Sequence, residues 1–479
     1  MPKNSNKYDA NLVVIGAGSG GLVSAYIAAA VKAKVFLIEK AHMGGDCLNT
    51  GCVPSKALIR AAKACHQAKH ANRYGVHVDN VQVDFAAVMA RVHEVIKEIE
   101  PHDSVERYTS LGVNCIQGEA KILSPNKVVV GDRELTTRHI IVATGAGPAV
   151  PPIPGLDTID YLTSDNLWQL KELPKRLLVV GGGPIGCELA QAFSRLGANV
   201  TVVDMADKLL PRADNDVSSY VQNAFVEENI QLKLGAGLKR FSEGQAIVEK
   251  DGQEETIEFD KVLIAVGRKP NTQGFGLQEL GVELNPNGTV KVDEYMRTSV
   301  EGILACGDVA GPYQFTHTAS HQAWYASVNA LFGGFKKFKT DYSTIPWVIF
   351  TDPEVAHVGA AENDLISAGV DYDVVKYDLD ELDRAIADGE NKGMVKVLMQ
   401  KGKDRILGAT IVGSHSGEII TEFVAAMKNK KGLNSILGTI HSYPTWSEAN
   451  KYAAGNWKRA NAPQTLLNWV EKYHAFRRR

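Results

Sequence analysis

The sequence is poor in cysteine, in long hydrophobic runs and in excess charge of either sign. Only 6 of its 479 residues are cysteine, too few for a disulfide-held scaffold. No run of about 18 apolar residues occurs, so we expect no membrane-spanning helix. A formal net charge of −3 gives no general attraction to nucleic acid or to an anionic membrane surface. The first residues are polar, without a signal-peptide core, and we expect a cytoplasmic protein.

Glycine, in contrast, is abundant, with 44 residues. Several of these glycines lie where short apolar runs end, which is typical of tight phosphate-binding turns. At 479 residues the chain is too long for a single hydrophobic core and suggests about three domains. A cytoplasmic chain of this kind uses a disulfide for catalysis more often than for structure.

Two cysteines, Cys47 and Cys52, lie in a glycine-rich segment that we expect to be a loop running into a helix. Pro54 suits the first helical turn, where its missing N–H is no loss. Cys52 then lies near a helix N-terminus, where the positive end of the dipole favours a thiolate. A disulfide between the two cysteines would close only a small ring and could open without unfolding the chain. The segment therefore predicts a redox-active pair.

Two alternatives to a redox pair are weaker. Zinc sites commonly have two residues between paired cysteines and need a second Cys or His pair, which is not found nearby. Two unrelated core cysteines would not need the surrounding glycines. We expect no metal ligands among these residues.

The first apolar run, residues 12–15, enters a glycine turn and an alanine-rich helix. A second run, residues 35–38, ends in Glu39, and Lys40 follows. A strand, a glycine turn, a helix and an acid at this distance form a dinucleotide-binding fingerprint. The helix N-terminus takes the pyrophosphate, and the acid takes the ribose hydroxyls. The glycines of the turn are Gly16, Gly18 and Gly21.

The same pattern recurs after residues 177–180, and the next strand ends in Asp204. An acid at this position accepts ribose hydroxyls and repels a 2′-phosphate, which favours NADH over NADPH. Lys208 and Arg212 lie close enough in sequence to leave NADPH open. Two complete fingerprints predict two bound dinucleotides. The glycines of this second turn are Gly181, Gly183 and Gly186.

Three further apolar runs are expected to be strands. The first is followed by Thr144 and Gly145, the second by Gly267, and the third, after Gly307, by Asp308. Ligands of open α/β sheets bind at the carboxyl ends of the strands. From about residue 342 the pattern changes to that of an α+β domain. The fold class we predict is α/β, with two Rossmann-like domains and a C-terminal α+β domain.

The ordered set of these motifs resembles the FAD-dependent pyridine nucleotide–disulfide oxidoreductases, with mercuric reductase-like and dihydrolipoamide dehydrogenase-like members most similar. The match covers essentially the whole chain, and two cysteines separated by four residues are a specific motif. The resemblance implies FAD on the first fingerprint and NAD(P)H on the second. It implies a homodimer formed by the C-terminal domain. The implied domains are 1–146 (FAD, first part), 147–267 (NAD(P)H), 268–341 (central) and 342–479 (dimerisation).

The resemblance also implies roles for single residues. Cys52 would lie beside the flavin, Cys47 would attack the acceptor, and Lys56 near the flavin would pair with Glu188. Asp308 would bind the ribityl chain. The remaining cofactor-binding residues by this resemblance are Gly45, Thr144, Gly145, Gly267 and His317, with Glu39 and Lys40.

One position departs from the family pattern. Thiol–disulfide members carry a His before the proline of this C-terminal motif, with a Glu to orient it, but here Tyr443 takes that position while Glu448 is present. A phenol with a pKa of about 10 is a poor base at neutral pH. His441, two residues away, could substitute or could be a packed histidine. Mercuric reductases are similar here, since they too carry a tyrosine in this region.

The predicted activity is electron transfer from NAD(P)H through FAD to the Cys47–Cys52 disulfide, and on to a thiol, disulfide or soft-metal acceptor. Dihydrolipoamide dehydrogenase proper, a diaphorase and a structural flavoprotein subunit of a larger complex remain open. After Pro463 the spacing predicts a helix with one apolar stripe. We expect this helix to pack on the body or across the dimer, rather than on a membrane.

Overall fold

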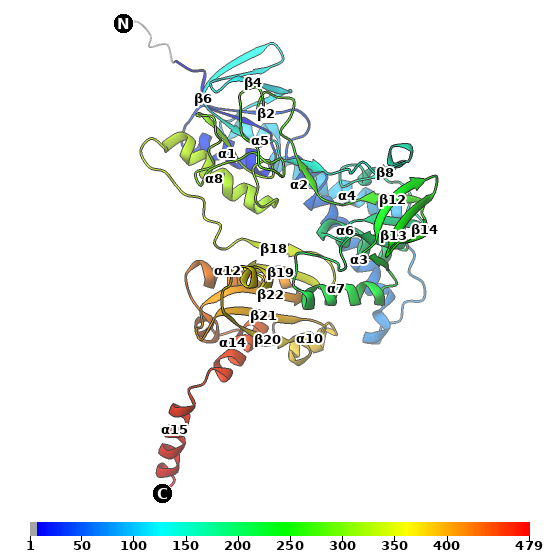
Figure 1. The fold of residues 1–479 in the computed structure, drawn as a ribbon, viewed down its shortest axis with the longest axis vertical. Coiled ribbons are helices and arrows are strands. Elements are labelled where there is room, and N and C mark those ends of the chain that lie inside the picture. The colour runs from blue at the N-terminus through cyan, green and yellow to red at the C-terminus, as the bar shows by residue number, and fades with distance from the viewer. Residues whose placement is uncertain (1–6) are drawn as a thin grey trace. The chain divides into compact units, whose positions relative to one another are not determined.

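The computed structural model describes residues 7–479, which form two compact units (Figure 1). The first unit contains the described residues up to Asp207 together with Ile230–Asp341. The second contains Lys208–Asn229 together with Tyr342–Arg479. The finer boundaries expected inside the first unit, at 146 and 267, stay predictions.

The first parallel sheet of the first unit is centred on β1 (Ala10–Ile15), whose buried apolar residues were expected to form a strand. It pairs in parallel with β2 (Val35–Glu39) on one side and β6 (Arg133–Val142) on the other. Helices α1 (Ser19–Ala30) and α8 (Thr316–Phe332) pack against each other and against β1. The parallel part also contains β3 (Asn114–Gln117) and β17 (Ile303–Ala305), while β4 (Ala120–Ser124) and β5 (Lys127–Val130) extend the sheet beyond β6 in antiparallel pairing.

The second parallel sheet repeats this arrangement around β9 (Arg176–Val180), next to β10 (Asn199–Asp204) and β15 (Lys261–Ile264). Helix α6 (Pro184–Leu196) begins in the second glycine turn. Both fingerprints therefore have the strand–turn–helix–strand structure that the sequence predicts. The smaller strands are β7 (Ala146–Pro148), β8 (Tyr161–Leu162), β11 (Gln231–Leu234), β12 (Gly237–Ser242), β13 (Gln245–Lys250), β14 (Gln253–Glu258) and β16 (Arg268–Pro270).

The remaining helices of the first unit lie between these strands. Two of them, α2 (Gly45–Asn49) and α3 (Cys52–Lys69), carry the cysteine pair. The others are η1 (Ala71–Tyr74), α4 (Phe85–Ile99), η2 (Glu100–Asp103), α5 (Val105–Ser110), η3 (Leu156–Thr158) and η4 (Leu167–Gln169).

The second unit is an α+β structure with an antiparallel sheet. Its strands in spatial order are β18 (Pro346–Ile349), β19 (Glu354–Gly359), β22 (Ile406–Gly413), β21 (Met394–Gln400) and β20 (Tyr372–Asp378). Its helices are α7 (Asn215–Glu227), α9 (Glu362–Ser367), η5 (Leu379–Glu381), α10 (Asp383–Asp388), α11 (Ser416–Ile419), α12 (Thr421–Lys428), α13 (Leu433–Leu437), α14 (Glu448–Ala460) and α15 (Gln464–Arg477). The predicted α/β fold with a C-terminal α+β domain is confirmed.

The helix predicted after Pro463 is α15. None of its residues is buried, and Trp469 and Phe476 are more than two-thirds exposed. Packing on the body is therefore not observed among the described residues, and packing across a dimer stays a prediction. No helix within residues 7–479 combines the length and apolar character needed to cross a bilayer.

A polar row crosses the sheet of the second unit. The strand register aligns the side chains of one face in the order Trp347, His357, Thr410, Lys396 and Lys376. Lys396, at the centre of β21, is 1% exposed. A lysine this deeply buried needs compensating negative charge, because its ammonium has lost its water.

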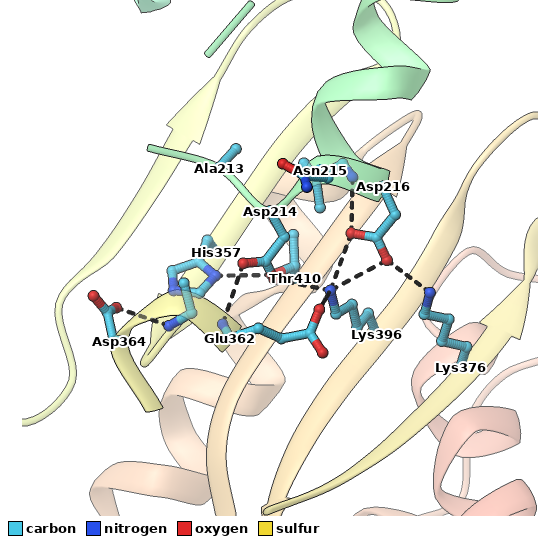
Figure 2. Close-up of polar contacts among 12 residues, drawn as sticks. Ala213, Asp214, Asn215, Asp216, His357, Glu362, Asp364, Lys376, Lys396 and Thr410 are labelled. Carbon is cyan, nitrogen blue, oxygen red and sulfur yellow. Dashed lines mark hydrogen bonds and ion pairs between the residues drawn. The ribbon is translucent and has the colours of Figure 1, made fainter. Parts of the chain in front are cut away.

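Three carboxylates surround the Lys396 ammonium, as Figure 2 shows. Its Nζ lies 2.8 Å from Asp214 and 3.0 Å from Asp216, and it also contacts Glu362. Burial alone would lower the pKa of Lys396, but these hydrogen bonds outweigh burial and raise it. The ammonium lies where a cation bound by these carboxylates would lie. We therefore interpret the cluster as a set of ion pairs that holds the start of α7 on the sheet.

We predict that Lys396→Met lowers the free energy of unfolding by about 3–5 kcal/mol, because the buried Asp214 carboxylate loses its ion-pair partner. Urea unfolding at pH 7 measures this change. Lys392, whose pair with Glu227 is exposed, provides the control, and Lys392→Met should cost less than about 1 kcal/mol.

The effect of Lys396→Met should also depend on pH. Burial opposes ionisation of Asp216, but Lys376 and Lys396 outweigh it and hold the Asp216 pKa below its usual value. A carboxylate whose pKa is lower in the folded state than in the unfolded state stabilises the fold at pH values above its unfolded-state pKa. This stabilisation is lost as the pH falls through the folded-state pKa. The difference in free energy of unfolding between wild type and Lys396→Met should therefore become smaller in acid. An equal difference at pH 7 and pH 3 would contradict the ion-pair role given to Lys396.

Candidate active site

The cysteine pair lies on two consecutive helices rather than in the loop that the sequence suggested. Cys47 lies within α2, which begins after Gly44 with its positive φ of 85°. Residues after Gly45 fold into a helical turn closed by Thr50, whose hydroxyl donates to Asp46 at 2.5 Å. Cys52 is the first residue of α3, as the position of Pro54 indicated.

The Cys52 sulfur receives hydrogen bonds and positive charge from several directions. Its pKa falls to about 6, first because Cys47 donates a hydrogen bond to it, and then because Thr316 and Lys56 stabilise the thiolate against the effect of burial. Thr316 Oγ1 lies 3.3 Å from Cys52 Sγ. Thr316 is the first residue of α8, so the N-termini of α3 and α8 both lie at this sulfur. Helix N-termini favour negative charge.

The two cysteines differ in ionisation. The pKa of Cys47 is raised, first by the hydrogen bond with Cys52 and then by burial. At neutral pH the pair is therefore one thiolate and one thiol. Both are free thiols in this structure. The thiolate at Cys52 is the group that the sequence analysis placed beside the flavin.

Lys56 lies one helical turn after Cys52 and forms an ion pair with Glu188, with Nζ 2.7 Å from Oε2. Glu188 belongs to α6, the helix of the second fingerprint, and is buried. The pair that the family resemblance implies is thus present. It connects the cysteine helix to the coenzyme-binding motif.

The first glycine turn is closed by Glu39. Its carboxylate accepts hydrogen bonds from Ala17 N at 2.6 Å and Ala41 N at 2.7 Å. A Cβ at Gly21 would lie 1.7 Å from the Gly16 carbonyl oxygen, so only glycine fits. Gly45 packs against Gly18, since a Cβ at Gly45 would lie 2.6 Å from Gly18 Cα. These close approaches leave a bare backbone cradle at the start of α1, which fits a dinucleotide pyrophosphate.

The second turn has the same construction. Asp204 accepts from Gly182 N at 2.5 Å and Ala206 N at 2.7 Å. A Cβ at Gly186 would lie 1.9 Å from the Gly181 carbonyl oxygen. The residues present fit a second dinucleotide. Lys208, which the sequence left open as a phosphate ligand, donates instead to Ala213 O and Asn215 Oδ1, each at 2.7 Å.

The other predicted cofactor residues of the first unit lie at strand ends. Thr144 Oγ1 donates to Asn271 O at 2.7 Å, and Asn271 N donates to Gly145 O. Four further predicted residues lie at turns or near helix starts. Lys40 is exposed after β2, Gly183 is the N-cap of α6, Gly267 has a φ of 130°, and the ring of His317 stacks on Phe315.

Asp308 follows β17 and lies 3.3 Å from Arg268 Nε. Burial raises the pKa of Asp308, and Arg268 counteracts this rise. Sequence reasoning missed Arg268 and Thr316 as site residues. No local spacing could have found them, because they lie 222 and 264 residues from their partners Asp46 and Cys52.

The three predicted relay residues lie in the second unit, each with a different partner. Tyr443 is 69% exposed, and its hydroxyl donates to Asp383 at 2.8 Å. His441 contacts Glu422 through Nε2 at 3.0 Å and Thr439 O through Nδ1. Glu448 accepts from Thr445 N at 3.0 Å and contacts the Tyr452 hydroxyl. Glu448 is near enough to Tyr443 to contribute to its raised pKa, but the hydrogen bonds described for Tyr443, His441 and Glu448 go to other partners.

Comparison with known proteins agrees with this geometry. The profile of the pyridine nucleotide-disulphide oxidoreductases matches residues 10–323, and the profile of their dimerisation domain matches residues 345–454. The chain is 36% identical over 455 residues to a mercuric reductase of Lysinibacillus sphaericus, covering 94% of this chain and 83% of the relative. It is 36% identical over 456 residues to a dihydrolipoyl dehydrogenase of Chlamydia pneumoniae, covering 94% and 97%.

Among solved structures, the Cu(II) complex of the HOCl-induced flavoprotein disulfide reductase RclA from Escherichia coli is similar, with a TM-score of 0.83. The two chains are 28% identical, with 94% of this chain and 99% of that chain covered.

The fold and the site define a flavoprotein disulfide reductase. The chain belongs to the pyridine nucleotide-disulphide oxidoreductase family with its dimerisation domain. It is an FAD-dependent NAD(P)H oxidoreductase with a redox-active cysteine pair, and its dimerisation domain indicates a homodimer.

We predict that alkylation of Cys52 by iodoacetamide in the reduced protein reaches half its maximal rate near pH 6, because only the thiolate reacts. Mass spectrometry of the Cys52 peptide gives the rate at each pH. Thr316→Val should move the midpoint up by about one pH unit, the value of one lost hydrogen bond to a charged group.

Ser320→Ala is the control for Thr316→Val. Ser320 lies one turn further along α8, and its hydroxyl donates to the Thr316 carbonyl oxygen. This control should leave the midpoint unchanged. A Thr316→Val midpoint equal to that of wild type would exclude a stabilising role for the Thr316 hydroxyl.

Proposed function

We propose that this protein is an NADH-dependent flavoprotein reductase that delivers electrons from Cys47 and Cys52 to a soft metal ion, and that it turns over dihydrolipoamide poorly. The observation that carries this proposal is the hydrogen bond from the Tyr443 hydroxyl to Asp383. This contact keeps the phenol protonated, since Asp383 raises the pKa of Tyr443.

Thiol–disulfide exchange needs a base for the incoming thiol and an acid for the leaving one, which contribute about 10²–10⁴-fold. A protonated phenol bound to a carboxylate is a poor base. His441, with both ring nitrogens in contacts and its side chain 5% exposed, is poorly placed to receive a proton from a substrate. A soft metal ion bound by thiolates needs no such relay.

NADH supplies two electrons and one proton, and the disulfide takes up both to become one thiolate and one thiol. The disulfide forms again when a bound Hg(II)-like ion accepts the two electrons, and the single proton is released to solvent. Bound FAD supplies the electron transfer between coenzyme and disulfide. The protein residues hold the sulfur atoms in place, keep Cys52 ionised and orient the coenzyme.

The names of the relatives are consistent with this choice. Mercuric reductases are among the similar proteins, and the similar RclA structure is a Cu(II) complex. Dihydrolipoyl dehydrogenases match equally well in sequence, and dihydrolipoamide dehydrogenase is therefore the second candidate function. The contact between His441 and Glu422 favours it, because this pair has the composition of a histidine–carboxylate base.

NADH is proposed as the donor because of Asp204. A carboxylate at the end of β10 repels a 2′-phosphate, and Lys208 is engaged by Ala213 O and Asn215.

We expect a kcat/KM for NADH at least about tenfold above that for NADPH, and we expect Asp204→Asn to narrow this ratio. Asparagine keeps an acceptor for Gly182 N while removing the charge. Asp207→Asn removes a charge three residues further on and should leave the ratio unchanged. A clear preference of the wild type for NADPH would contradict the proposal.

An acceptor panel tests the function directly. With NADH, turnover of Hg(II) and of artificial diaphorase acceptors should exceed turnover of lipoamide by about 10²–10⁴-fold. Tyr443→His should raise the lipoamide rate more than the diaphorase rate, because Glu448 is near and a carboxylate can accept a further hydrogen bond.

His441→Ala is the decisive companion variant. Under this proposal it leaves both rates unchanged. If wild-type protein reduces lipoamide as fast as artificial acceptors and His441→Ala abolishes that rate, then His441 is the base and the second candidate function is correct.

A further inference from the structure

Arg268 lies between two carboxylates of the active site. Its Nη2 is 2.5 Å from Asp46 Oδ2 and donates to Ala146 O at 2.6 Å, while its Nε is 3.3 Å from Asp308 Oδ2. The Arg268 side chain is 14% exposed. Its Nε forms no hydrogen bond among the described residues, because the Asp308 oxygen lies off the N–H direction.

The two carboxylates belong to different functional segments. Asp46 directly precedes Cys47, and its neighbour Gly45 packs on Gly18 in the pyrophosphate cradle. Asp308 is the residue expected at the ribityl chain. Arg268 follows the second parallel sheet at the start of β16. Three segments far apart in sequence therefore meet at one guanidinium.

Without Arg268, the negative charge of Asp46 would be unfavourable at this site. A free carboxylate beside a cradle for a diphosphate repels the phosphates. It also disfavours a thiolate, and accordingly Asp46 acts to raise the pKa of both Cys47 and Cys52. In a partly buried site this repulsion is poorly screened. One buried guanidinium facing both carboxylates removes the problem.

We propose that Arg268 is a positioning residue for FAD, which neutralises Asp46 and Asp308 and holds the α2 turn against the FAD-binding cradle. This proposal does not depend on the identity of the acceptor or on the choice between NADH and NADPH.

The test is a double-mutant cycle with Arg268→Gln, Asp46→Asn and the combined variant. The readout is the dissociation constant for FAD added back to apoprotein, measured by flavin fluorescence, together with the flavin-to-protein absorbance ratio after purification. Arg268→Gln should weaken FAD binding at least about tenfold, because it leaves two partly buried carboxylates unpaired. Asp46→Asn alone should bind FAD within about threefold of wild type, since removing the repelling charge costs little.

The combined variant distinguishes this proposal from a general structural role. Asp46→Asn with Arg268→Gln should recover most of the lost affinity, because the unpaired charge next to the cradle is gone. Lys269→Gln removes a neighbouring exposed charge and should not change FAD binding. Wild-type affinity in Arg268→Gln would overturn the proposal, and so would equal losses in the single Arg268 variant and the combined variant.

A second readout holds even if Arg268→Gln does not fold. Asp46→Asn should shift the alkylation midpoint of Cys52 to lower pH, because a negative charge near the thiolate is lost. An unchanged or higher midpoint would also overturn the proposal. Failure of the acceptor predictions would leave both readouts intact, so the two proposals can be separated.

Discussion

The active site depends on keeping one sulfur negatively charged in a neighbourhood rich in carboxylates. Cys52 is favoured as a thiolate by two helix N-termini, by the Thr316 hydroxyl and by Cys47. Glu188 and Asp46 are held by Lys56 and by Arg268. Each positive side chain therefore has two roles. It forms an ion pair with a nearby acid, and it thereby reduces the negative charge that would oppose ionisation of Cys52.

In both dinucleotide cradles a carboxylate holds the glycine turn in shape. An acid at the end of the second strand binds a backbone N–H of the glycine turn, Glu39 to Ala17 and Asp204 to Gly182. This contact fixes the turn before any ligand arrives, so less conformational entropy is lost on binding. It also leaves the acid beside the expected ribose. Each acid thus shapes its cradle, and we expect the same carboxylate to meet the ribose hydroxyls.

Features encoded by short-range spacing were predictable from the sequence, and features encoded by long-range contacts were not. The strands, the two fingerprints and the α+β domain followed from local patterns. The helix at Cys47 was missed because Gly44 and Gly45 suggested a loop, whereas Gly44 takes a left-handed conformation that starts α2. Thr316 and Arg268 were missed because their partners lie more than 200 residues away in sequence. The buried Lys396 cluster likewise joins segments 180 and 182 residues apart.

The predicted relay residues around Tyr443 do not share one hydrogen-bond chain. Each member of the region has its own partner: Tyr443 has Asp383, His441 has Glu422, and Glu448 has Thr445 N. In a relay of the usual kind the carboxylate at position 448 would orient an imidazole at position 443. Here Glu448 accepts a hydrogen bond from Thr445 N at the start of α14, so it has a structural role of its own. The presence of Glu448 alone is therefore no argument for thiol–disulfide chemistry, and the identity of residue 443 carries more weight in the choice of acceptor.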